Sequence, residues 1–192
     1  MSTLRGRQGV AAKALEFVIL NAVRSGEARG ARWSEIDRAI GIWTIPAGRM
    51  KSGREHRVPL SDRAIEILAE LPRETGDHDD GYVFIGGRPR TPLSDMSLLA
   101  VLRRMECEDL TVHGFRSTFR DWAGEQTNFA RDVVEAALAH TIADKTEAAY
   151  RRGDALAKRK RLMDAWAGYC ASMKRGELVT PAELDQRRRE RG

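Results

Sequence analysis

Cysteine is scarce in this sequence, which has only two among 192 residues, Cys107 and Cys170. They lie far apart in the chain and match no metal-ligand spacing, so we expect no disulfide scaffold, and a reducing cytoplasm is the default compartment. Long apolar runs are also missing: none reaches the ~18 residues that cross a bilayer, and no charged-then-apolar start with a small-residue cleavage site marks a secretory signal. We therefore expect a cytoplasmic protein with no membrane segment.

Positive charge, in contrast, is in excess, with 33 Lys and Arg against 28 Asp and Glu and a net charge of +5. Hydrophobic residues make up 42% and charged residues 32%, which is ordinary for one globular domain. A basic surface attracts nucleic acid, anionic membranes or acidic proteins, so the sign of the charge does not identify the partner. Basic residues gather at 49–57, at 151–161 and in the final RRRERG. These segments are either binding surfaces or simply solvated faces.

The hydrophobic pattern predicts a mostly α protein with a small antiparallel β-sheet near the front, an α+β class. Residues 42–45 (IWTI) and 56–60 (HRVPL) are typical of strands, and the basic loop between them predicts a hairpin with a positively charged tip. Residues 82–85 (YVFI) are a further strand candidate. Helices are expected over 11–23, 61–71, 94–106, most of the chain from 112 with breaks near 128, 141 and 153, and 154–173.

The sequence shows no internal repeat and no second domain. Residues 1–10 are expected to be a flexible start or linker, and residues 11–175 one folded domain. Residues 176–192 turn polar and basic, and we expect this tail to be partly disordered.

Two pairs of residues have a spacing of three, which brings their side chains close together on a helix. His113 and Arg116 lie three residues apart, so on a helix they project from one face, and a guanidinium can pair with two phosphate oxygens at once. Arg24 follows the first apolar helix, and Glu27, three residues later, is a natural ion-pair partner for it. Each pair taken alone also fits a plain role, a surface or capping pair for the first and a structural ion pair for the second.

Three more residues have side chains suited to proton transfer or nucleophilic attack. Lys51 lies in the basic loop, and its ammonium can give a proton to a leaving oxygen, although a lone lysine in such a loop is more often simply solvated. His140 ends an Ala-rich helix, and Tyr150 follows ten residues later. A tyrosine becomes a nucleophile once its proton is removed or cations stabilise its phenolate, and Arg151 and Arg152 flank this one. The alternative is a tyrosine packed on a helix.

The order of these residues along the chain is more specific than any one of them. It resembles the catalytic signature of the tyrosine recombinases, also called the phage-integrase family, at six positions: Arg24, Lys51, His113, Arg116, His140 and Tyr150. The flanking text matches as well, with AVRSGEARGARWSEID, MKSGREHRVPLS, TVHGFRSTFRDWA and LAHTIADKTEAAYRRGD around these positions. The resemblance spans residues 12–173 and is similar to the prophage and genomic-island branch of the family.

The resemblance implies the tyrosine-recombinase catalytic-domain fold and a reaction at a DNA phosphate. Tyr150 would attack the scissile phosphate and form a 3′-phosphotyrosyl link, while Arg24 and Arg116 would hold the non-bridging oxygens. Lys51 would protonate the leaving 5′-oxygen, and His113 would assist proton transfer at the tyrosine. The expected function is therefore that of a site-specific DNA recombinase, an integrase catalytic domain that supports integration or excision of a mobile element.

Two further positions are implied to support this reaction. His140 would hydrogen-bond the phosphate, and Glu27 would orient its neighbours. Because these cations supply the charge that metal ions supply elsewhere, we expect no cofactor and no metal. The sequence has no carboxylate cluster suited to Mg²⁺, and His113 and His140 have no third ligand at a convincing spacing.

The resemblance also implies which partners to expect. These are double-stranded DNA at an attachment or crossover site and further copies of the chain, as a tetramer on DNA, which would place the protein at the nucleoid. The 154–173 helix would either dock on a neighbouring copy or pack within its own chain. Family members usually carry an N-terminal DNA-clamping domain, so we expect this chain to be a fragment or separate domain that binds DNA weakly.

Two other classes of function remain open at this point. One is a non-catalytic DNA-binding remnant or regulator that keeps the recombinase fold, although the filled catalytic positions argue against decay. The other is a basic interaction protein that binds another recombinase subunit through its last helix.

Overall fold

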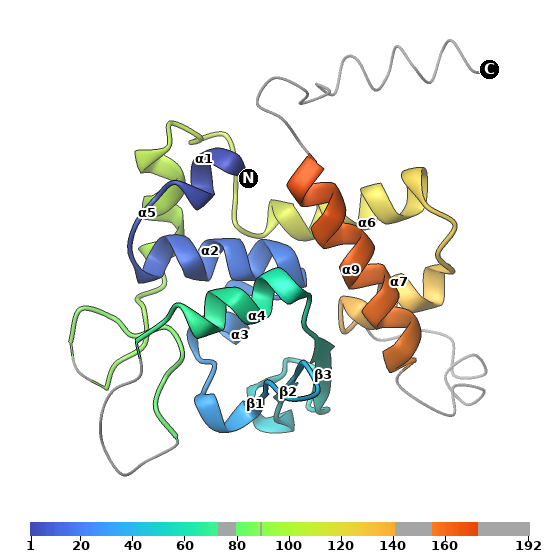
Figure 1. Cartoon of the computed structure of the whole chain (residues 1–192), viewed down its shortest axis with the longest axis horizontal. Coiled ribbons are helices and arrows are strands. Elements are labelled where there is room, and N and C mark those ends of the chain that lie inside the picture. The colour runs from blue at the N-terminus through green and yellow to red at the C-terminus, as the bar shows by residue number, and fades with distance from the viewer. Residues whose placement is uncertain (73–79, 89, 141–154, 173–192) are drawn as a thin grey trace.

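The computed structural model describes residues 1–72, 80–88, 90–140 and 155–172, shown in Figure 1. Within these ranges the chain is mostly helical with a small antiparallel sheet, which confirms the predicted α+β class. The strands are β1 (Ile36–Asp37), β2 (Ile42–Ile45) and β3 (His56–Pro59), and short 3-10 helices are η1 (Trp33–Glu35) and η2 (Ala47–Arg49). The α-helices are α1 (Ser2–Arg5), α2 (Val10–Asn21), α3 (Ser25–Arg29), α4 (Asp62–Ala69), α5 (Ser97–Arg104), α6 (Gly114–Gln126), α7 (Arg131–Ala137) and α9 (Leu156–Ser172).

Helix α2 lies at the centre of the fold, as its almost wholly apolar sequence predicted. Helices α4, α5 and α9 pack around it, and Phe17 meets the rings of Trp43 and Phe84 at centroid distances of 5.6 and 5.3 Å. The helix ends where Ala22 adopts the left-handed conformation, with φ at 49°. This turn directs the chain into α3, so the packing of α2 also places the residues that follow it.

The predicted hairpin is confirmed. Strands β2 and β3 pair antiparallel, with Ile42 opposite Pro59 and Ile45 opposite His56. The basic loop between them is exposed over most of residues 51–55. Strand β1 adds a third strand through its pairing with β2, and the sequence pattern did not predict it because two residues are too few to show an alternation.

The strand predicted over residues 82–85 is wrong. This segment forms only isolated bridges, from Tyr82 to Arg32 and from Ile85 to Pro92. The turn-rich sequence after it folds the chain back at once, since the Gly86 amide donates to the Thr91 carbonyl at 2.7 Å. The central residues of the segment, Val83 and Phe84, are buried in the core without joining the sheet ladder.

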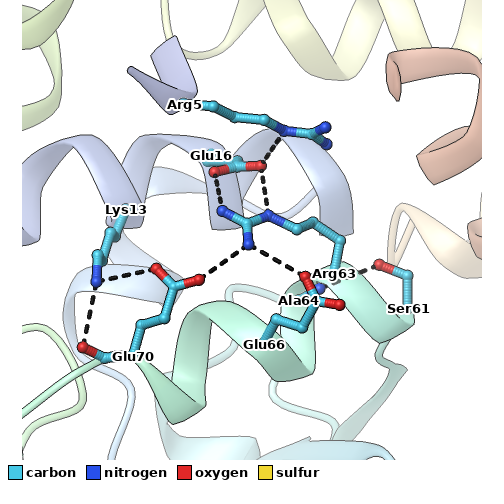
Figure 2. Close-up of polar contacts among 8 residues, drawn as sticks. All are labelled: Arg5, Lys13, Glu16, Ser61, Arg63, Ala64, Glu66 and Glu70. Carbon is cyan, nitrogen blue, oxygen red and sulfur yellow. Dashed lines mark hydrogen bonds and ion pairs between the residues drawn. The ribbon is translucent and has the colours of Figure 1, made fainter. Parts of the chain in front are cut away.

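Residues 1–10, for which we expected a flexible start or linker, include helix α1. Leu4 is buried, and Arg5 donates from Nε to Glu16 of α2 at 2.7 Å. Figure 2 shows that Glu16 also accepts from Arg63 of α4, which in turn contacts Glu66 and Glu70. These contacts tie the first helix to the body of the domain.

The helices expected from residue 112 onwards form a second group. A break separates α6 from α7 near residue 128, as predicted, and the breaks expected near 141 and 153 lie outside the described residues. Helix α9 packs on its own chain: the Trp166 indole donates to the Ile19 carbonyl at 2.8 Å and contacts the rings of Phe119, Trp122 and Tyr169. Both cysteines are free thiols, and none of the described helices is long and apolar enough to cross a bilayer.

Candidate functional site

A pocket of about 370 Å³ opens where α3, the β2–β3 loop and the start of α6 meet. Five residues singled out in the sequence line it: Arg24, Glu27, Lys51, His113 and Arg116. They come from three segments that are far apart in the chain. The structure thus brings four cationic or imidazole side chains and one carboxylate to the same cavity.

Arg24 and Glu27 are placed by the start of α3. Arg24 is the residue before the helix, and its backbone amide donates to Oε2 of Glu27 at 2.8 Å, which satisfies one of the amides that a helix leaves open at its N-terminus. Its guanidinium Nη1 donates to Oε1 of the same carboxylate at 2.7 Å. The ion pair proposed from the sequence is therefore present, and Glu27 orients both the backbone and the side chain of Arg24.

Arg116 is the most firmly held cation of the pocket. It lies in the first turn of α6 and is only 5% exposed. Its Nη1 donates to the Ala22 carbonyl, and its Nη2 donates to the Leu138 carbonyl at 2.7 Å. Burial, together with the charge of Arg24, lowers the pKa of Arg116 to about 10. The guanidinium stays protonated at neutral pH, and because carbonyl groups have no net charge its positive charge remains available to an anion.

His113 and Lys51 are the exposed members of the site. His113 immediately precedes α6, and its carbonyl accepts from the Arg116 amide at 3.0 Å, so the two residues share one turn as their spacing predicted. Lys51 lies in a turn in which the Gly53 amide donates to the Met50 carbonyl at 3.0 Å. Gly53 has a φ of 64°, a conformation that a glycine adopts without strain. This turn presents Lys51 at the rim of the pocket.

His140 joins the site through Arg116. Its Nε2 lies 3.4 Å from Nη2 of Arg116, and its Nδ1 lies 2.6 Å from Oε2 of Glu135. Since a guanidinium only donates, Nε2 is the acceptor and Nδ1 carries the proton that Glu135 accepts. Burial raises the pKa of Glu135, but the His140 hydrogen bond and the charge of Arg120 outweigh it, so the net pKa is lowered. Glu135 therefore acts as an ionised residue that orients His140.

Sequence reasoning missed two residues at this site besides Glu135. Arg49 lines the pocket, although the sequence showed it only as part of a basic segment. His56 lies buried behind the pocket, and burial together with the charge of Arg159 lowers its pKa to about 4. Both residues flank Lys51 in the basic segment 49–57, but neither has a spacing that indicates a role.

Tyr150 lies outside the described residues, so its place in the site stays a prediction. Among the residues that the structure does describe, no three His, Cys, Asp or Glu side chains gather as metal ligands would.

Comparison with known proteins gives consistent results. The chain matches the phage integrase family over residues 6–156. It is 37% identical over 163 residues to prophage integrase IntA of Escherichia coli strain K12, covering 84% of this chain and 39% of that protein. It is 32% identical over 162 residues to the integrase of Shigella phage Sf6, covering 83% of this chain and 41% of that protein. The chain spans less than half the length of these relatives.

Solved structures resemble the fold at lower sequence identity. The integrase from mycobacterium phage Brujita superposes with a TM-score of 0.64 at 20% identity, covering 96% of this chain and 60% of that one. The XerA recombinase superposes with a TM-score of 0.52 at 16% identity, covering 88% of this chain and 63% of that one. Both likenesses concern the fold alone.

Proposed function

Because the chain belongs to the phage integrase family, we propose that it cleaves and rejoins DNA strands as the catalytic domain of a site-specific recombinase. The observation that carries this proposal is the pocket in which Arg24, Lys51, His113 and Arg116 meet, with His140 bound to Arg116. Such a site suits one DNA phosphate at the point where strands are exchanged, and the reaction supports integration or excision of a mobile element.

The phosphate is the part of the substrate that this pocket fits best. Its charge is negative, and a guanidinium can donate to two of its oxygens at once. Arg24 is oriented by Glu27 and Arg116 by two backbone carbonyls, so neither has to reorganise when charge builds up on the phosphoryl oxygens. Preorganised donors of this kind contribute about 100-fold or more each to the rate.

The chemical step needs a nucleophile and an acid. We assign the nucleophile to Tyr150, whose phenolate oxygen forms a bond to phosphorus while the bond from phosphorus to the 5′-oxygen breaks. His113 assists removal of the tyrosine proton, and Lys51 gives a proton to the departing 5′-oxygen. The phosphotyrosyl link keeps the energy of the broken phosphodiester, so the reverse attack by a 5′-hydroxyl reseals the strand. To donate to the phosphate, Nε2 of His140 takes up a proton from solvent and its contact with Arg116 breaks, while Nδ1 keeps its hydrogen bond to Glu135.

Double-stranded DNA is the partner that this reaction requires, and we propose that copies of the chain assemble on it as a tetramer. The apolar side of α9, including Leu162, Met163 and Trp166, is buried within its own chain. Contacts between copies therefore involve other surfaces, or an exchange of this helix between neighbours.

A covalent trapping experiment tests the assignment. A nicked duplex that carries the crossover site of the chain's own element loses a short strand after cleavage, so the phosphotyrosyl adduct accumulates and survives denaturation. We expect Tyr150→Phe to abolish the adduct and to leave DNA binding within about 3-fold of wild type, because the hydroxyl reacts but contributes little to binding. An adduct that persists in this variant rules out Tyr150 as the nucleophile.

Two further outcomes of the same assay separate the alternatives. DNA binding without any adduct in the wild type favours a non-catalytic remnant that keeps the recombinase fold. Cleavage that stops when EDTA is added favours a metal-dependent nuclease, whereas the proposed chemistry proceeds unchanged.

A further inference from the structure

Arg49 lines the pocket, but its guanidinium is already occupied by the protein. Nη1 of Arg49 donates to both carboxylate oxygens of Glu35, and Nη2 donates to the backbone carbonyl of Glu27. The side chain therefore links η2, which precedes the Lys51 turn, to α3, which holds Arg24. Because both Nη atoms of Arg49 are engaged and its charge is also paired with Glu35, Arg49 is placed to position its neighbours rather than to bind a phosphate itself.

Glu35 is in turn fixed by the core. Its Oε2 accepts from the indole Nε1 of Trp43 at 2.9 Å and from the Arg32 amide at 3.3 Å, and its side chain is only 8% exposed. Trp43 is fully buried in the middle of β2. The Glu35 carboxylate, at the end of η1, is thus fixed to strand β2 of the sheet through Trp43.

A glycine makes room for this link. A Cβ atom added at Gly30 would lie 2.9 Å from Nη2 of Arg49, closer than such atoms approach in proteins. The absence of a side chain at the end of α3 therefore lets the guanidinium reach the Glu27 carbonyl. The same residue, Glu27, uses its carboxylate to orient Arg24.

We propose that Arg49 is a positioning residue that, together with Glu35, holds the Lys51 turn against α3 so that Lys51 and Arg24 address the same phosphate. The inference rests on the proposed function of Lys51 as the acid. A lysine has a long flexible side chain, and a general acid must come within hydrogen-bond reach of the leaving oxygen. Only Met50 separates Arg49 from Lys51, so two residues of chain, about 7 Å at most, connect the anchor to the acid.

Hydrogen exchange in the DNA-free protein tests the anchoring itself. We expect the amides of Met50 and Gly53, which donate to the Ala47 and Met50 carbonyls, to exchange at least about 5-fold faster in Arg49→Met and in Glu35→Gln than in wild type, because opening of the turn is no longer opposed by the ion pair. Arg54→Met is the matched control, since it removes the same charge from the same loop and leaves the Glu35 contact intact. Unchanged exchange in both variants overturns the proposal, whatever the chemistry of the site.

The chemistry is tested with two versions of the nicked DNA substrate, one ordinary and one with sulfur in place of the 5′-bridging oxygen. A thiolate leaves without protonation because a thiol has a pKa of about 8.5, so the sulfur substrate does not need Lys51. General acid catalysis is worth about 100- to 10,000-fold, so a misplaced acid lowers the adduct-forming rate on the oxygen substrate by about 10-fold or more. We expect Arg49→Met and Glu35→Gln to show this loss, to regain a rate within about 3-fold of wild type on the sulfur substrate, and to bind DNA normally.

Lys51→Ala is the reference that separates the two proposals. Rescue of Lys51→Ala by sulfur without rescue of the Arg49 and Glu35 variants overturns the positioning role and leaves the acid assignment standing. Failure of Lys51→Ala to be rescued overturns the acid assignment, and the exchange experiment then decides the anchoring alone. Circular dichroism identifies any variant that does not fold. If Arg49→Met does not fold, Arg49→Lys replaces it, because one ammonium group can still pair with Glu35.

Discussion

Arg24 and Arg116 both line the pocket, yet the protein holds their charges differently. Glu27 compensates Arg24 through a 2.7 Å ion pair, whereas Arg116 is held by carbonyl oxygens that have no net charge. Burial and the nearby Arg24 lower the pKa of Arg116 without neutralising it. A bound anion relieves this repulsion, because it places an opposite charge beside the two guanidinium groups. In the proposed function, phosphate binding therefore depends mainly on Arg116, whose guanidinium donates to two carbonyl groups and to no carboxylate.

His56 lies behind this site, and its burial makes stability depend on pH. Burial and the charges of Arg159, Arg116 and Arg24 lower its pKa from 6.5 to about 4, against a hydrogen bond with the backbone of Ala137. The native state keeps the imidazole neutral, while the unfolded chain takes up a proton below pH 6.5. This contribution to stability is complete above pH 6.5 and is lost as the pH falls towards 4.

We expect His56 alone to lower the free energy of unfolding by about 1.5 kcal/mol between pH 6.5 and pH 5, since each unit of pKa difference is worth about 1.4 kcal/mol and the unfolded imidazole is already half protonated at pH 6.5. Urea unfolding of wild type and His56→Gln at both pH values measures this effect. The variant lacks the titrating ring, so its stability falls less, and the contributions of carboxylates cancel in the comparison. Equal losses in the two proteins contradict the burial of a neutral histidine.

At the scale of elements, one buried carboxylate joins α1, α2 and α4 (Figure 2). The Glu16 side chain is 3% exposed and accepts from Arg5 at 2.7 Å and from Arg63 at 3.0 and 3.1 Å. Glu16→Gln keeps one acceptor oxygen and loses the charge that both arginines share. We expect it to lower the free energy of unfolding by about 2 kcal/mol, because hydrogen bonds to charged groups contribute about 1.5 to 3 kcal/mol.

Glu66 offers a matched control for this change. It also pairs with Arg63, at 3.1 Å, but its side chain is 63% exposed. Exposed pairs contribute about 0 to 1 kcal/mol, so we expect Glu66→Gln to change stability by less than about 0.5 kcal/mol. Urea unfolding at neutral pH compares the two variants, and a loss of the same size in both would contradict the buried role of Glu16.

Elements were predictable where a local pattern determines them. The apolar sequence of α2 requires burial on most sides, and Ser61 accepts from the Ala64 amide at 3.4 Å to begin α4 where expected. Residues 82–85 have the pattern of a strand, but their backbone partners, such as the Ala31 carbonyl that accepts from Val83 at 2.8 Å, lie outside the sheet. Which partner a short apolar segment meets depends on the tertiary fold, so its pattern alone misled the prediction.

For the site, too, a local sequence pattern predicts only contacts between residues that are close in the chain. The Arg24–Glu27 pair follows from local spacing, but nothing local indicates that Lys51 and Arg116 share a pocket with it, and that expectation came from the family resemblance. Arg49 was missed because its function depends on Glu35, which lies beside it through η1 and the pairing of short strands. Positioning residues are defined by partners that are distant in the sequence, so spacing rules do not find them.

At the scale of the whole molecule, which has a net charge of +5, lysines that pair with carboxylates differ from a lysine that is exposed at the pocket. Away from the pocket, Lys13 donates to Oε2 of Glu70 at 3.0 Å and Lys160 to Asp164 at 2.6 Å, so these charges are locally compensated. At the pocket, Lys51 is exposed at the tip of the hairpin. DNA that lies over the pocket therefore meets Lys51 rather than the paired lysines.

This arrangement predicts how DNA binding responds to salt. Each phosphate that a lysine neutralises adds about 0.9 to the slope of log affinity against log salt, so we expect Lys51→Gln to reduce the slope by about 1. Lys13→Gln removes the same formal charge from the molecule but from an ion pair with Glu70, and we expect the slope to stay unchanged. Fluorescence anisotropy with a labelled duplex, between about 50 and 200 mM salt, measures both slopes. If the two variants lose slope equally, the binding depends on total charge alone, and DNA does not sit over the pocket as the proposed chemistry requires.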